Sequence, residues 1–245
     1  MKKLLLLLSV FLLLSTQLLF AQSWSAVHPA FFPTNNSGQI HGISRISQVK
    51  FHATNPAKWY AVSARGGLFL SSDTGRTWAV APGCDYMAYS RFSAVCVDHT
   101  NDNIIYLASG DANYYYTGSG ILKSTNGGTT FTTTGGLNGL VILEILMDPL
   151  DHNVLIAATS NGIYKTTNAG STWTINATTS GVAFYDLQRK ANSSSRVLYA
   201  ASSSDFYLSN DFGTTWTKIT SGIYIPSGYT AGNGARIAVS PADSN

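Results

Sequence analysis

The sequence predicts an all-β protein assembled from repeated four-stranded units. Aromatic residues make up 12% of the 245-residue chain, which also has 22 glycines, a composition typical of short strands joined by tight turns. The acidic residues are eleven Asp and one Glu, Glu144, and Asp favours turns whereas Glu favours helices. The third observation is a polar segment of eight residues that occurs four times.

The repeated segment first appears as SSDTGRTW at residues 71–78. It recurs as STNGGTTF at 124–131, TTNAGSTW at 166–173 and SNDFGTTW at 209–216. The starts are 53, 42 and 43 residues apart, and a period near 42 fits one four-stranded blade of a β-propeller. The sequence therefore predicts a β-propeller of four-stranded antiparallel blades.

Each unit supplies its four strands in order. The first is an apolar segment, at 48–56, 94–102, 144–152 and 185–193. The second is rich in β-branched and aromatic residues, at 58–64, 104–110, 154–160 and 196–202. The third leads into the polar segment, at 66–72, 119–125, 161–167 and 204–210. The fourth begins around the aromatic residue of that segment, at 77–82, 130–134, 172–176 and 215–219.

A fifth unit begins at 234–245, where IAVSPADSN matches ILMDPLDHN of the third unit. At the other end, QSWSAVHP at 22–29 resembles a fourth strand without its polar segment. We therefore expect about four blades plus the start of a fifth. The expected architecture is an incomplete propeller, truncated at its C-terminal end and left with two unpaired sheet edges.

The polar segment is predicted to be the hairpin turn between the third and fourth strands. Its position-three Asp or Asn can accept hydrogen bonds from N–H groups one or two residues on, its position-five Gly can take positive φ, and its position-eight aromatic ring packs over the sheet. Two copies carry Asn in place of Asp, which removes the charge a cation needs, so the segment is predicted to bind no metal. The residues given this structural role are Ser71, Asp73, Gly75, Trp78, Ser124, Asn126, Gly128, Phe131, Thr166, Asn168, Gly170, Trp173, Ser209, Asp211, Gly213 and Trp216.

These segments resemble the Asp-box, or BNR repeat, of secreted β-propellers such as sialidases, sortilin and the xyloglucan-degrading endoglucanases. The resemblance covers roughly residues 25–245. It implies that ligands bind on the face formed by the loops from strand four to the next strand one and from strand two to three, opposite the boxes. The expected glycan- or peptide-binding residues are Arg45, Arg65, Tyr86, Tyr89, Arg91, Asp111, Tyr114, Tyr115, Tyr116 and Arg236. The alternative for the tyrosines is packing between loops of neighbouring blades.

Catalytic residues are not identified in the chain. The sialidase Arg-Ile-Pro signature reads Arg45-Ile46-Ser47, and Glu144 lies in an apolar strand. The acid expected before Gly-Gly in a xyloglucan endoglucanase is replaced by Ala64, and Asp111 has no evident carboxylate partner, whereas inverting hydrolysis needs two. We therefore expect a binding or scaffold module without a cofactor. The alternative is a glycoside hydrolase whose remaining catalytic residues lie downstream.

The N-terminus predicts export. MKK is a basic region, an apolar core follows, and Ala21 is a small residue at the cut, so residues 1–21 read as a signal peptide and 22–245 as the propeller region. A membrane anchor is the alternative reading of the apolar segment. Without Lys2 and Lys3, 13 basic and 12 acidic residues remain, which argues against nucleic-acid binding. The expected location is outside the cell or at its surface.

Export also makes the two cysteines informative. Cys84 and Cys96 are predicted to form a disulfide in an oxidising compartment, because they lie close together in sequence. The alternative is two small buried residues that do not meet.

Overall fold

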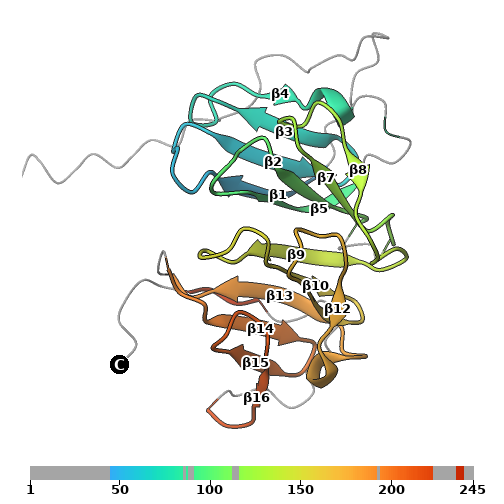
Figure 1. Cartoon of the computed structure of the whole chain (residues 1–245), viewed down its shortest axis with the longest axis vertical. Helices are drawn as coiled ribbons and strands as arrows, with labels where there is room; N and C mark the ends of the chain where they lie inside the picture. The colour runs from blue at the N-terminus through green and yellow to red at the C-terminus, as the bar shows by residue number, and fades with distance from the viewer. Residues whose placement is uncertain are drawn as a thin grey trace, which may run out of the picture.

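The computed structural model of the chain describes residues 45–84, 87, 91–111, 116–191, 194–222 and 236–239. These residues form four antiparallel sheets, each made of four strands in chain order, which stack one after another (Figure 1). Helical structure in the described ranges is limited to the short 3-10 turns η1 (Pro82–Cys84) and η2 (Ala177–Thr179). The predicted all-β fold of about four blades is confirmed, and each sheet is called a blade below.

The strands agree closely with the predicted segments. Blade one contains β1 (Ile46–Phe51), β2 (Trp59–Ser63), β3 (Gly67–Ser71) and β4 (Ala79–Val80). Blade two contains β5 (Phe92–Val97), β6 (Ile105–Ser109), β7 (Ile121–Ser124) and β8 (Thr132–Thr133). Blade three contains β9 (Ile142–Met147), β10 (Leu155–Thr159), β11 (Gly162–Thr166) and β12 (Thr174–Ile175). Blade four contains β13 (Phe184–Arg189), β14 (Leu198–Ser202), β15 (Phe206–Ser209) and β16 (Thr217–Ile219).

The hydrophobic core is divided among the junctions between blades. Side chains alternate between the two faces of a strand, so one strand serves two junctions. On β10, Leu155 packs in the cluster shared with blade two, whereas Ile156 packs in the cluster shared with blade four. The same alternation on β5 sends Val95 toward blade one and Ala94 toward blade three. Each blade is therefore stabilised mainly by its neighbours.

One face of β1 is exposed where its counterparts are buried. Ile46, Val49 and Phe51 are 44%, 42% and 62% exposed, whereas Phe92 and Val95, which pair in the same register on β5, are fully buried under blade one. Among the described residues, nothing covers this face as blade one covers β5. The side of blade one that carries these three residues is thus an apolar surface.

The repeated segment is the hairpin turn between strands three and four, as predicted, and its glycines have positive φ, for example 79° at Gly75. Its hydrogen bonds differ from the prediction. The Ser71 hydroxyl accepts the nearby N–H groups of Asp73 and Gly75, at 3.4 and 2.9 Å. The Asp73 carboxylate instead accepts from the N–H and hydroxyl of Thr77, four residues on, at 2.8 and 2.6 Å.

Position four of the turn is also left-handed, which the sequence did not indicate. Thr74, Ala169 and Phe212 have φ of 62°, 54° and 53°, a region that residues other than Gly rarely adopt. The N–H of each donates to a carbonyl of the loop between strands one and two of its own blade, for example Phe212 to Arg196 at 2.9 Å. This contact holds the strained residue in place and fixes the turn against the neighbouring loop.

The predicted disulfide is wrong. Cys84 and Cys96 are not bonded to each other. Cys84 lies on η1 in the core between blades one and two, whereas Cys96 packs on the core between blades two and three. Cys96 and Val95 are adjacent on β5 and point to opposite faces, so closeness in sequence places the two thiols on different sides of one blade.

Several predictions fall outside the described residues: the signal peptide at 1–21, the segment at 22–29, and Tyr86, Tyr89, Tyr114 and Tyr115. Of the fifth unit, residues 236–239 are described. Ile237 N donates to Asp186 Oδ2 at 2.7 Å, in the way that Val95 N of blade two donates to Gln48 Oε1 of blade one at 2.8 Å. This segment therefore meets β13 as the first strand of a following blade would. In the described ranges no helix is long and apolar enough to cross a membrane.

Candidate ligand-binding site

An ion pair joins blade one to blade two on the face predicted to bind ligands. Arg45 precedes β1 and Asp111 follows β6, and the Arg45 Nη2 lies 2.6 Å from Asp111 Oδ1. The Asp111 side chain is only 4% exposed, against 35% for Arg45. A carboxylate buried to this degree needs its charge partner, so the pair fixes the position of the loop after β6.

A second arginine lies beside this pair. Arg91 precedes β5 as Arg45 precedes β1, since the two carbonyls accept from Gly110 and Ala64 at the same place in each blade. The Arg91 guanidinium lies 4.7 Å from the centroid of the Tyr116 ring, a cation–π contact. Tyr116 pairs with Asp111 through two backbone hydrogen bonds of 2.9 and 3.1 Å and is 47% exposed.

Four of the predicted site residues thus form one continuous group, the loop-face cluster of Arg45, Arg91, Asp111 and Tyr116. The contacts given above for the cluster do not include the remaining described residues. Arg65 is exposed in the turn between β2 and β3 and follows Ala64, whose N–H donates to the Arg45 carbonyl. Arg236 donates from Nη1 to the Tyr185 carbonyl at 2.7 Å, two blades away from the cluster.

Sequence reasoning missed a polar group on the inner strands. Glu144 on β9 accepts from Gln48 Nε2 at 2.6 Å, and Lys50 Nζ lies 3.3 Å from its other carboxylate oxygen. Burial raises the pKa of Glu144, while Lys50 and the hydrogen bonds oppose that shift. The repeat contains a signal for this contact. Gln48 on β1 pairs with Val62 and Glu144 on β9 pairs with Ala158, so the two polar residues occupy equivalent positions in their blades.

The comparisons with known proteins agree with this architecture. Residues 119–227, less than half of the chain, match the Sortilin-Vps10 family, described as sortilin, neurotensin receptor 3. No curated protein matches the chain. Among solved structures, an ancestral GH74 enzyme aligns with a TM-score of 0.56 at 19% identity over 74% of this chain. The GH74 xyloglucanase from Xanthomonas campestris aligns with a TM-score of 0.57 at 20% identity over 75% of this chain.

The chain is a β-propeller. YCF48 bound to D1 peptide also aligns, with a TM-score of 0.50 at 19% identity over 72% of this chain. The chain spans 26%, 31% and 55% of the lengths of the ancestral enzyme, the xyloglucanase and YCF48. At these identities the likeness shows the fold alone. The propeller resembles those of sortilin and the xyloglucanase, as the repeated segments predicted.

Proposed function

We propose that the propeller is a ligand-binding module and that the loop-face cluster contacts the ligand. The observation that carries the proposal is Tyr116, whose half-exposed ring stacks on the Arg91 guanidinium and whose backbone pairs with that of Asp111. A rigid aromatic face next to charged hydrogen-bonding groups suits a sugar ring or a peptide side chain. The neighbouring structures allow both classes, since one is a xyloglucanase and another has a bound peptide.

The state of Asp111 argues against hydrolysis at this cluster. Glycoside hydrolysis by inversion uses two carboxyl groups about 6.5–9.5 Å apart, one of which accepts a proton from water. Asp111 is nearly buried and its Oδ1 is occupied by Arg45, and among the described residues of the cluster it is the one carboxylate. This supports a binding role over the alternative, a xyloglucanase-like or sialidase-like glycoside hydrolase.

Binding to the full chain tests the proposal. Panels of β-glucan and xyloglucan oligosaccharides and of short unstructured peptides are screened, and any ligand is titrated by calorimetry. We expect Tyr116→Ala to weaken binding about tenfold or more, which corresponds to about 1.4 kcal/mol. Leu150→Ala, at an exposed residue between β9 and β10, is the control and should bind normally. Unchanged binding in Tyr116→Ala, or xyloglucan hydrolysis lost in Asp111→Asn, would contradict the proposal.

We also propose that the propeller acts outside the cell or at its surface, after cleavage of residues 1–21. The support is the basic and apolar N-terminal sequence followed by Ala21. Expression of the full chain with N-terminal sequencing of the exported product should give a mature protein that begins at Gln22. Retention of Met1 in a membrane-bound product would favour the anchor.

A further inference from the structure

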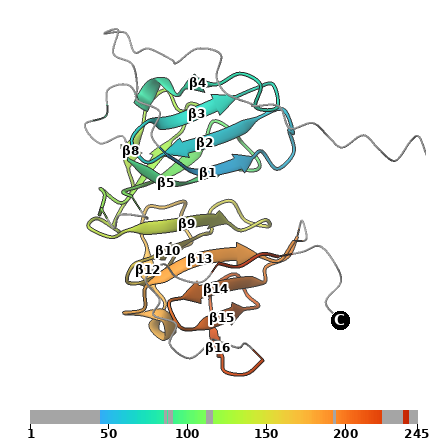
Figure 2. The ribbon, with the colours of Figure 1, turned by 180° about the vertical axis from the view of Figure 1, so that it is seen from behind.

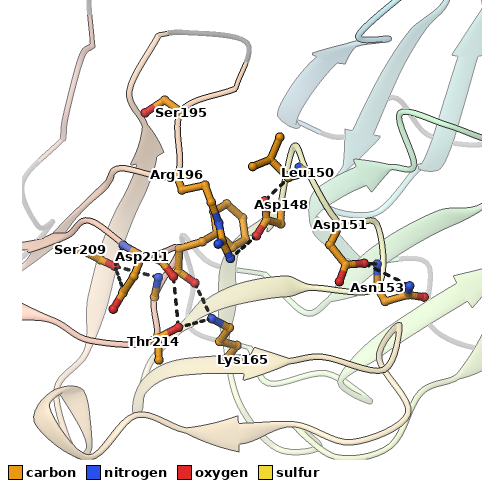
Figure 3. A network of polar contacts seen from close by, with 12 residues as sticks. Asp148, Leu150, Asp151, Asn153, Lys165, Ser195, Arg196, Ser209, Asp211 and Thr214 are labelled. Atoms are coloured by element: carbon orange, nitrogen blue, oxygen red, sulfur yellow. Dashed lines mark hydrogen bonds and ion pairs between the residues drawn. The ribbon is translucent and has the colours of Figure 1, made fainter.

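At two junctions between blades, on the Asp-box side, a lysine of one blade donates a hydrogen bond to the next blade. Lys123 of β7 donates to the carbonyl of Ala169 at 3.2 Å, and Lys165 of β11 donates to the carbonyl of Phe212 at 2.9 Å. Lys165 also contacts the Thr214 hydroxyl at 2.6 Å (Figure 3). Ala169 and Phe212 occupy position four of the Asp-box in the following blade. The ammonium group of one blade thus binds the turn carbonyl of the next.

The first junction lacks this lysine. Leu70 on β3 pairs with Tyr60 and Ala79, and Lys123 pairs with Tyr106 and Thr132, so Leu70 and Lys123 hold the same place in their blades. The turn carbonyl that a lysine here would meet is that of Gly127. A cavity of about 310 Å³ lies at this point, and its walls include Tyr60, Leu70 and Gly127.

The walls of the cavity carry the groups that hold an ammonium at the next junction. There, Lys123 Nζ lies 5.2 Å from the centroid of the Tyr106 ring, and the Tyr106 hydroxyl donates to the Ala169 carbonyl at 3.2 Å. Tyr60 supplies the equivalent ring in blade one. An aromatic face and a carbonyl oxygen together favour a cation that donates hydrogen bonds.

A carboxylate also reaches the cavity. Asp102, in the loop between β5 and β6, and Lys58 of blade one both line it, and Lys58 pairs with Asp102 Oδ2. Both side chains are partly exposed, 30% for Asp102 and 39% for Lys58. The pair is neutral overall, so Lys58 does not leave a net positive charge that would exclude a second cation.

We propose that this cavity binds a primary alkylammonium group, in the position that Lys123 and Lys165 fill at the next two junctions. The ammonium would donate to the Gly127 carbonyl and to Asp102, and its alkyl chain would lie against Tyr60 and Leu70. A lysine side chain of a partner protein and a free aliphatic amine share this chemistry. The site lies on the Asp-box face, opposite the loop-face cluster, and is independent of the function proposed above.

Ligand-observed NMR on the full chain tests the site with n-butylamine and with Nα-acetyl-lysine methylamide. Both should bind saturably, and the Nε-acetylated lysine derivative and n-butanol should not. Equal affinities would mean that the ammonium and its alkyl chain suffice, and tighter binding of the lysine derivative would point to a peptide; both results support the site. Absence of saturable binding by either amine, or equal binding of the uncharged analogues, would overturn it.

The lysine of the next blade shows which substitution would block the cavity. Leu70→Lys should place an ammonium in the cavity, lower the affinity for both amines by about tenfold or more, and shift the Gly128 amide resonance without ligand. Leu208→Lys makes the same change at the equivalent residue of blade four and should bind normally. If Leu70→Lys unfolds, Tyr60→Leu removes the ring and should also abolish binding. Normal binding in a folded Leu70→Lys or Tyr60→Leu protein would refute the proposal.

Discussion

Arg196 of blade four pairs across the junction with Asp148 of blade three, whose side chain is completely buried. The Arg196 Nη2 lies 2.7 Å from Asp148 Oδ2, and Leu150 N donates to Asp148 Oδ1 at 3.0 Å (Figure 3). One junction earlier, Asp98 and His152 repeat the arrangement at 2.9 Å. The carboxylate that ends the first strand of a blade thus takes its partner from the next blade, and Figure 2 shows these blades stacked in chain order from behind.

Replacement of Arg196 should destabilise this junction. In Arg196→Ala the buried Asp148 charge loses its partner, so we expect about 2–3 kcal/mol of unfolding free energy to be lost. The value is below that of a fully buried pair because Arg196 is 41% exposed and water can enter. Urea denaturation measures it. Lys218→Ala breaks an exposed pair with Asp205 in the same blade and should change little. Equal losses in the two variants would contradict the burial argument.

The aromatic residue of the box should matter more where it is buried. Trp216 is 5% exposed and packs against Ile156 of blade three, whereas Trp78 is half-buried. Trp216→Ala should cost about 3–5 kcal/mol and Trp78→Ala clearly less, as measured by thermal unfolding. Trp216→Phe is the matched control, since Phe131 fills that position in blade two. A larger loss of stability in Trp78→Ala than in Trp216→Ala would show that the aromatic ring stabilises its own blade and not the contact with the neighbouring blade.

Acid should weaken the first box. Hydrogen bonds from the Thr77 hydroxyl and N–H lower the pKa of Asp73 to about 2. A carboxyl group with a lowered folded pKa stabilises the fold above its unfolded pKa of about 3.9, and this contribution is lost as pH falls through the folded value. NMR of the Asp73 side-chain carboxyl should give a midpoint near 2. Asp73→Asn should keep the turn, as Asn126 does, and lose this pH dependence. A midpoint near 4 would count against the turn geometry.

The two cysteines should be recovered as separate thiols. Burial raises the pKa of Cys96 to about 12, so its thiolate is scarce at neutral pH and alkylation should be slow until the protein unfolds. Mass spectrometry of non-reduced, denatured and alkylated protein should find both Cys84 and Cys96 modified. A Cys84–Cys96 linked peptide would show that the two faces of β5 are not separated as described.

The exposed face of β1 should promote association of the purified chain. Ile46, Val49 and Phe51 present apolar side chains on one strand, and such patches drive contact between proteins. Val49→Lys should shift the size-exclusion profile toward the monomer. Leu150→Lys, at a residue that is 67% exposed elsewhere, should not. If the original chain is monomeric at every concentration tested, this face does not mediate association.

The sequence predicted the blades because the information that defines them is local. Each Asp-box encodes its own hairpin, so residue spacing alone placed every sheet. The contacts between blades were not predicted, because Arg45 and Asp111 are far apart in sequence and no short pattern links them. Thr74 likewise gave no sign of its left-handed backbone, which tertiary contacts impose on an unfavourable residue. The cysteine error came from treating closeness along the chain as closeness in space.

The two kinds of junction contact place different demands on recombination between repeats. Lys165 binds a backbone carbonyl, which any residue at position four of the following turn provides, so a foreign blade would satisfy it without adaptation. Asp148 and Arg196 recognise each other through side chains, and a blade inserted between them must carry both halves of the pair. Because Lys165 and Asp148 act at the same junction between blades three and four, the Asp148–Arg196 pair, and not the lysine contact, restricts which blade can follow blade three.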